Sequence, residues 1–201
     1  MSKVQVCNRA LSKYLGAKSI NSLDEETAEA EQCKLHYDDT LKGLLEYHPW
    51  TFANTRQVLA EKTNDRTKEW TYRYQLPANC LYLRWVNDPE VARYMIQQDL
   101  NPDSSREMSG DNIYSDVNGA VCEFTTLVED VNLMPQLFKD ALSAALAAAI
   151  CMPITEDVSR QRNAEGAAQE LLDIAAARDE GLGNASEYLS MPGYMQARGI
   201  T

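Results

Sequence analysis

The sequence has few of the residues that perform chemistry at an active site. Its 201 residues include two histidines, His36 and His48, and none of the motifs GxGxxG, GxxxxGKS/T or GxSxG. Zinc centres use clustered histidine and cysteine ligands, and nucleotide-binding loops and serine hydrolases need those glycine motifs. The sequence therefore predicts no cofactor, no metal site and no serine hydrolase.

Positive charge is also in deficit. Lysine plus arginine number 19 against 30 aspartates and glutamates, which gives a formal net charge of −11. The deficit holds along the chain, with 6 against 8 in residues 1–49, 8 against 13 in 50–133 and 5 against 9 in 134–201. Stable DNA or RNA binding needs a basic surface that neutralises phosphates. This composition disfavours it.

Long apolar segments and paired cysteines are missing too. The most apolar stretch, residues 141–152, precedes Pro153, and we expect this proline to end the helix well short of a bilayer span. No N-terminal run is typical of a signal peptide. The cysteines form no CxxC pair and lie in apolar patterns, which predicts buried thiols in a reducing cytoplasm. They are Cys7, Cys33, Cys80, Cys122 and Cys151.

Both ends of the chain show helical periodicity. Residues 4–15 predict a first helix with Gly16 as its C-terminal cap. Ser22 and Glu25 match a capping box, which predicts a second helix over residues 23–47.

Two more helices are predicted near the other end. One begins at Pro135 and runs to Cys151, and its many alanines allow close approach to neighbours. The other begins near Thr155, as its cap, and ends at Gly181. Residues 182–201 show no sustained periodicity.

The middle of the chain has a different pattern. Residues 90–100 predict a short helix, and residues 101–112 an exposed loop. Asn118-Gly119 predicts a two-residue hairpin turn, in which both residues take a positive φ. Aromatic and β-branched runs predict strands at 56–60, 70–76, 80–86, 113–117 and 120–128.

We therefore predict an α+β protein: a four-helix bundle built from both chain ends, with an inserted β-rich lobe and an extended C-terminal arm. The bundle comprises residues 1–49 and 134–181. The lobe comprises residues 50–133, and the arm comprises residues 182–201.

Paired acids are the main sequence signal for an enzyme. A glycosidase needs two carboxyl groups, which Asp24-Glu25-Glu26, Asp38-Asp39 and Glu156-Asp157 offer. The simpler interpretation is that the first and third begin helices and the second faces solvent. Cys33 and His36 have the spacing of a thiol and its base, although a buried Cys33 and an exposed His36 is the simpler interpretation.

Aromatic residues alternate with arginines in the middle of the chain. Such residues can stack single-stranded bases, but the net negative charge favours a sheet with one face in the core and one at its surface or at a subunit contact. The residues are Trp50, Phe52, Trp70, Tyr72, Tyr74, Tyr82 and Trp85, with Arg56, Arg73 and Arg84.

Several stretches together resemble a known family. SLDEETAEA is followed by YDDTLKGLLEYHPWTFANTRQVLA, then WTYRYQLPANCLYLRWV, then an Asn-Gly turn and LVEDVNLMPQLFKDALSAALAAAI. In this order they resemble the tail tubular protein A family, the head-to-tail adaptors of short-tailed bacteriophages. The resemblance spans about residues 2–180, and its specificity lies in the series rather than in any single motif.

The resemblance implies a structural virion protein without enzymatic activity. It implies a dodecameric ring beneath the portal, carrying the tail nozzle, with double-stranded DNA passing through the lumen. The helical bundle would dock on the portal and the β lobe would face the tail. Residues 101–112 would contact the nozzle or a neighbouring subunit. A cell-wall glycosidase carried in a phage tail is the alternative function.

The C-terminal arm would grip the portal, because an unstructured segment with large apolar residues is suited to ordering on a partner. A frayed terminus is the alternative. The arm residues are Leu182, Tyr188, Leu189, Met191, Tyr194 and Met195.

The stretch YHPWTFANTR marks the change from helix to strand. Pro49 lacks an amide proton and disfavours helical geometry at His48, so the second helix must end there. We expect Trp50 and Phe52 to share one side of the departing strand and to pack where bundle and lobe meet. His48, Pro49, Trp50 and Phe52 are thus predicted to form a hinge between the two.

Overall fold

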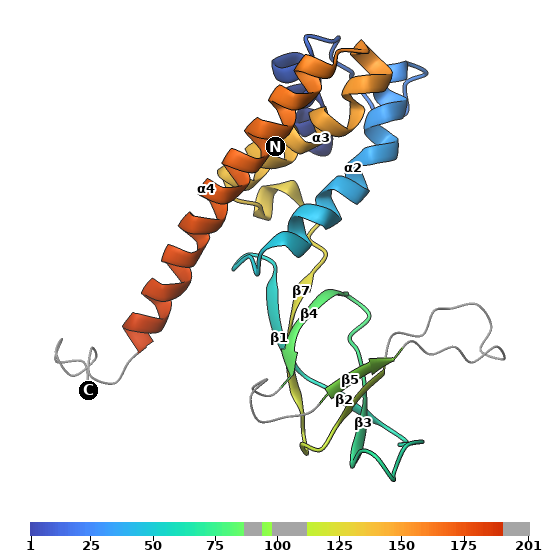
Figure 1. Ribbon diagram of the computed structural model, residues 1–201, viewed down its shortest axis with the longest axis vertical. Helices are drawn as coiled ribbons and strands as arrows, with labels where there is room; N and C mark the ends of the chain where they lie inside the picture. Colours follow the sequence, from blue (N-terminus) through green and yellow to red (C-terminus); the bar gives the residue numbers. More distant parts are fainter. Residues whose placement is uncertain (87–93, 98–111, 191–201) are drawn as a thin grey trace. The chain divides into compact units, whose positions relative to one another are not determined.

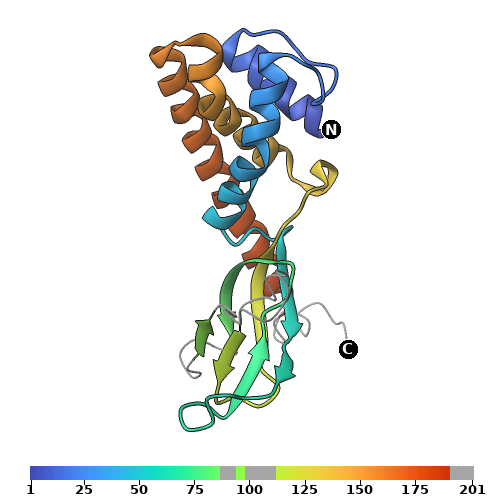
Figure 2. The ribbon, with the colours of Figure 1, turned by 90° about the vertical axis from the view of Figure 1, so that its right-hand side faces the viewer.

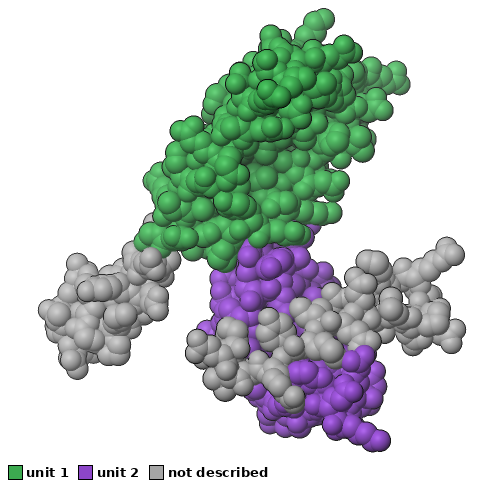
Figure 3. Space-filling model, viewed as in Figure 1, with its two compact units in different colours: residues 1–52, 128–201 green, residues 53–127 purple. Residues whose placement is uncertain are grey.

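The computed structural model describes residues 1–86, 94–97 and 112–190. The chain divides into two compact units: Met1–Phe52 with Val128–Thr201 form unit 1, and Ala53–Leu127 form unit 2 (Figure 3). Unit 1 is helical and unit 2 contains antiparallel strands, which confirms the α+β class. The divisions lie a few residues from the predicted positions, so that Trp50 and Phe52 belong to unit 1.

Segments from both ends of the chain lie side by side in unit 1 (Figures 1 and 2). The N-terminal helix α1 continues as one π-helical segment, η1, and α2 follows after a loop. Near the other end, α3 and α4 follow each other closely. The bounds are α1 (Lys3–Arg9), η1 (Ala10–Leu15), α2 (Ala28–Tyr47), α3 (Gln136–Thr155) and α4 (Val158–Ser190).

Helix α3 is the shared packing partner in unit 1, because it contacts α1, η1, α2 and α4. Its fully buried residues include Phe138, Leu142, Leu146 and Ile150, spaced by four. Among the described residues, α3 alone is long and apolar enough to cross a membrane, a test that a buried core helix also passes. Arg9 of α1 binds Asp140 of α3 in an ion pair at the edge of this core.

Helix ends agree with the sequence where local stereochemistry fixes them. Helix α2 ends at Tyr47, and His48 before Pro49 is extended, with φ −138° and ψ 148°. Gly16 caps η1 in the left-handed region, with φ 62°. Both results confirm the predictions.

Three other predictions at helix ends are wrong. Glu25 accepts the amide of Ser22 at 3.1 Å, but residues 22–27 form turns, and Thr27 caps α2 instead. Pro153 lies inside α3, in its last turn, where a missing N–H removes only one helical hydrogen bond. Asp157, not Thr155, caps α4 by accepting the amides of Ser159 and Arg160.

Helix α4 also continues past Gly181 to Ser190. The prediction of an extended arm is therefore wrong for residues 182–190, which include Leu182, Tyr188 and Leu189. A glycine costs a helix only about 1 kcal/mol relative to alanine, so glycines alone do not end a long helix. Met191, Tyr194 and Met195 lie outside the described residues.

Unit 2 consists of two antiparallel sheets, with strand orders β1-β7-β4 and β2-β3-β6-β5. Tyr74, Ile113, Cys122 and Phe124 are central to its apolar core. The strands are β1 (Asn54–Val58), β2 (Ala60–Lys62), β3 (Tyr72–Gln75), β4 (Cys80–Val86), β5 (Tyr94–Gln97), β6 (Asn112–Ser115) and β7 (Val121–Thr126).

The predicted Asn118-Gly119 hairpin is not formed. Strand β6 pairs with β3 and β5, whereas β7 pairs with β1 and β4, so the turn connects two sheets. Gly119 has a φ of 65°, but Asn118 does not take the positive φ that the predicted turn needs. The helix predicted over residues 90–100 is also wrong, because Tyr94–Gln97 form a strand. Of the loop predicted over residues 101–112, residues 101–111 lie outside the described residues, and Asn112 is instead the first residue of β6 and is buried.

Candidate functional site

The HPW corner, which we define as residues 48–52, lies in unit 1 directly after α2. The Trp50 amide donates to the His48 carbonyl at 2.8 Å, which turns the chain around Pro49. Strand β1 begins only at Asn54. The expectation that Trp50 and Phe52 lie on a strand is therefore wrong, because both residues belong to the turn that precedes it.

Trp50 is the anchor of this corner. It is 1% exposed, and its indole Nε1 donates to the Leu44 carbonyl at 2.8 Å. Leu44 lies in the last turn of α2, where carbonyls have no partner inside the helix. Edge-to-face contacts join the Trp50 ring to Phe138 of α3 at 5.0 Å and to His48 at 4.8 Å. The Phe52 ring also lies 5.0 Å from Phe138.

A buried carboxylate joins the same corner to α4. Asp179, 5% exposed, accepts the Thr51 amide at 2.8 Å on Oδ2 and the Thr51 hydroxyl at 2.7 Å on Oδ1. The Nε2 atom of His48 lies 3.6 Å from Oδ2, too long for a hydrogen bond but close enough for an ion pair when the imidazole is protonated. Charged acceptors strengthen hydrogen bonds, so Asp179 fixes where the chain leaves unit 1.

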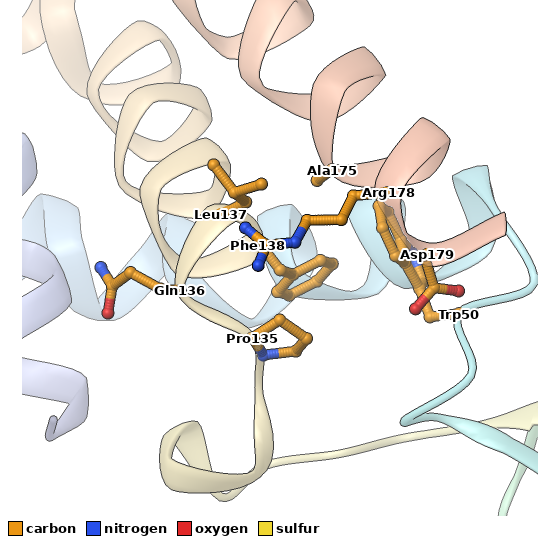
Figure 4. A pocket seen from close by; sticks show the side chains of 8 residues that line it. All are labelled: Trp50, Pro135, Gln136, Leu137, Phe138, Ala175, Arg178 and Asp179. Carbon is orange, nitrogen blue, oxygen red and sulfur yellow. The ribbon is translucent and has the colours of Figure 1, made fainter. Parts of the chain in front are cut away.

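Beside the corner is a cavity of about 230 Å³, which we call the Trp50 pocket. Its walls are mainly apolar and come from the corner, from the start of α3 and from α4 (Figure 4). The Arg178 side chain extends from α4 toward Leu137 and Phe138. The lining residues are Trp50, Pro135, Gln136, Leu137, Phe138, Ala175, Arg178 and Asp179. This arrangement is suited to binding an apolar group rather than to catalysis.

In each group of acids considered for a glycosidase, one carboxylate has a structural partner. Lys34 donates to Asp24 at 2.7 Å, and this hydrogen bond and charge lower the pKa of the Asp24 carboxyl. Asp38 pairs with Lys3 at 2.6 Å. Asp157 caps α4. These pairings favour the interpretation of these acids as structural.

Cys33 turns toward the core, as expected, where its partner is Cys7 rather than His36. The hydrogen bond to Cys33, together with burial, raises the pKa of the Cys7 thiol, so that Cys7 stays protonated at neutral pH. All five cysteines are free; four are buried as predicted, and Cys80 is partly exposed. The expectation of an exposed His36 is wrong, because this residue is partly buried.

The aromatic residues of unit 2 divide between core and surface. Tyr74 is 1% exposed and belongs to the core, whereas Tyr82 is 47% exposed. Arg84 lies 4.5 Å from the Tyr82 ring centroid, and Arg56 lies 5.0 Å from that of Trp85. Such arginines cover aromatic faces through cation–π contacts. This division favours the predicted separation of a core face from an outer face, although these residues belong to two sheets rather than to one.

The sequence pointed to His48, Pro49, Trp50 and Phe52, and the structure brings the rings of His48, Trp50 and Phe52 together with Phe138. The sequence alone does not indicate the partners on α3 and α4, because Phe138 and Asp179 are distant along the chain and are not singled out by any pattern. No protein-family model matches this chain, and no curated protein matches it.

Proposed function

We propose that this protein is a subunit of a head-to-tail adaptor ring in a short-tailed bacteriophage, joining the portal to the tail nozzle. The observation that supports this most is the ordered series of stretches resembling the tail tubular protein A family, from SLDEETAEA to the alanine-rich segment of α3. The ring would be a dodecamer and part of the virion.

Two features of the chain support the proposal. Helices from both chain ends form unit 1 and strands form an inserted unit 2, which offers different surfaces for different partners. In the proposal, unit 1 contributes a four-helix ring body that docks on the portal, and unit 2 faces the nozzle. The net charge of −11 suits a channel through which duplex DNA slides without being held by its phosphates.

The portal contact is assigned to α4 beyond Gly181 and to the residues that follow it. The backbone of residues 182–190 is already helical, which lowers the entropic cost of binding relative to a fully unstructured arm. Residues 191–201 complete this contact in the proposal.

Electron microscopy of the purified chain mixed with the portal of its phage tests the proposal. We expect a ring stacked on the portal. Free monomers that ignore the portal would refute it.

Two truncations test the portal contact separately. Deletion of residues 191–201 removes only the segment after α4, whereas deletion of residues 182–201 also removes the last helical turns. We expect weaker portal binding from the first and none from the second. Full binding by the longer deletion would refute the assignment of the contact, although the ring would still stand.

A further inference from the structure

Leu133 is an apolar side chain held out into solvent. It is 66% exposed, the highest value among the large apolar residues of the described chain. Its two anchors, Val131 and Met134, are 4% and 2% exposed. Val131 and Met134 thus fix the segment in the core of unit 1, while Leu133 between them is exposed.

The backbone around Leu133 is fixed by a 3-10 helix, η2 (Val131–Leu133). Asp130 caps it by accepting the Asn132 amide at 2.9 Å, and the Leu133 amide donates to the Asp130 carbonyl at 3.1 Å. A side chain on a fixed backbone loses little entropy when it binds, so Leu133 is pre-organised for a contact.

The Trp50 pocket is suited to receive such a side chain. Its volume of about 230 Å³ exceeds the ~150 Å³ of cavities known to bind benzene, and a leucine side chain is smaller than benzene. Trp50 and Phe138 give it aromatic walls. Pro135 lines the pocket of its own subunit, but Leu133, two residues earlier, does not. The Leu133 side chain is exposed instead.

Charge complementarity points to a second copy of this chain. Glu129 and Asp130, both exposed, precede Leu133, and Asp130 is engaged by its cap. Arg178 lines the pocket, is exposed, and has no ion pair within the described chain. A leucine entering from another copy brings these carboxylates toward Arg178.

We propose that Leu133 of one subunit inserts into the Trp50 pocket of the next, with Glu129 facing Arg178. A projection on one copy that fits a pocket elsewhere on another makes a head-to-tail contact, which forms a ring when the rotation closes. The closed ring in this inference rests on the proposed function, but the contact between two copies of the chain does not require a ring.

Cross-linking of the free protein tests the contact without the portal. Leu133→Cys and Ala175→Cys are prepared separately in a Cys80→Ser background, mixed, and treated with a short bismaleimide. We expect a covalent heterodimer from the mixture. Leu35→Cys is the matched control, because Leu35 is 63% exposed on α2 and away from the pocket. Equal yields from Leu35→Cys and Leu133→Cys would overturn the proposal.

Association measured by sedimentation velocity gives the strength of the contact. Burial of a leucine side chain corresponds to about a 10- to 100-fold lower dissociation constant. We therefore expect Leu133→Asp to raise the dissociation constant by this factor and Leu35→Asp to leave it unchanged. Arg178→Glu should weaken association, and Glu129→Arg should restore it in that variant. If Arg178→Glu weakens association and Glu129→Arg does not restore it, the charge pairing is refuted.

Ring formation on the portal separates this inference from the proposed function. If wild type forms rings and Leu133→Asp forms them equally well, the inference fails and the adaptor proposal stands. If wild type ignores the portal, the adaptor proposal fails, and cross-linking of the free protein decides the contact. Thermal melts establish that each variant is folded.

Discussion

Trp50→Ala should destabilise unit 1 more than any other single change at the HPW corner. The substitution removes a side chain that is 1% exposed, together with its edge-to-face contact with Phe138 and its hydrogen bond to the Leu44 carbonyl. Tryptophan-to-alanine changes in cores cost about 3–5 kcal/mol. We expect the upper half of that range, because Trp50 borders an existing pocket, and few neighbouring side chains can move to fill the enlarged cavity.

Trp50→Phe separates the two contributions. It keeps an aromatic ring against Phe138 but leaves the Leu44 carbonyl without its donor, and loss of one hydrogen bond costs about 0.5–1.5 kcal/mol. We therefore expect about 0.5–1.5 kcal/mol for Trp50→Phe. For a chain of this length each kcal/mol lowers Tm by about 2–4 °C, so a loss of about 4–5 kcal/mol in Trp50→Ala should lower it by roughly 8–20 °C.

Circular dichroism at 222 nm follows the helical unit during thermal and urea unfolding. The control is Trp85→Ala, because Trp85 lies in unit 2 and is only partly buried beneath Arg56. It should leave the helical transition unchanged. A loss below about 1 kcal/mol for Trp50→Ala, or equal losses for the Phe and Ala variants, would refute this account of the corner.

Three further outcomes follow from particular contacts. Asp179→Ala leaves the Thr51 amide without its acceptor and should cost about 1–3 kcal/mol in urea unfolding, whereas a neutral result would mean that water replaces the carboxylate. The Tyr114 hydroxyl donates to Asp65 at 2.8 Å and lowers the pKa of that carboxyl, so its stabilisation is present above the unfolded pKa of ~3.9 and is lost as pH falls through the lower folded value. The difference in unfolding free energy between wild type and Tyr114→Phe should therefore shrink below about pH 4; a difference independent of pH would contradict the assignment. Gly16→Ala should cost about 1–2 kcal/mol, because φ is +62° and the new Cβ would lie 3.1 Å from Arg160 Nη1, and an unchanged Tm would show that the turn relaxes.

The parts of the fold that the sequence predicts well are those that local stereochemistry controls. Pro49 ends α2 and Gly16 caps η1, because each residue restricts or frees φ without help from the rest of the molecule. Strand β4 begins and ends at the predicted residues, Cys80 and Val86, since its run is long and flanked by turn residues.

Predictions that depend on tertiary partners fail. Asn118-Gly119 is a strong hairpin signal only when the two flanking strands pair with each other, and here each strand finds better partners in a different sheet. Pro153 does not end α3 at Cys151, because the helix up to Cys151 is held by burial against other helices, and a proline in the last turn removes only one helical hydrogen bond. A sequence pattern does not contain those partners.

The candidate site shows the same division. Its aromatic half, Trp50 and Phe52, stands out beside a proline, and a motif search finds it at once. Asp179 resembles any other acid of a polar helix, because its neighbours in sequence are charged and its burial comes from packing against the corner. Only the fold distinguishes Asp179, the one buried aspartate among the described residues, from the other aspartates.

Asp179 links the HPW corner to α4 through its two hydrogen bonds with Thr51. Through Thr51, this carboxylate holds the last residues of unit 1 before the chain enters unit 2. Through its own backbone, it begins the final stretch of α4, which ends at Ser190 and to which we assign the portal contact. A displacement of α4 at Asp179 must therefore move Thr51 or break two hydrogen bonds to a buried charge, at a cost of about 1.5–3 kcal/mol each. In the proposed adaptor, a force applied to α4 by the portal would therefore be transmitted through this one side chain to Thr51, among the last residues of unit 1 before unit 2 begins.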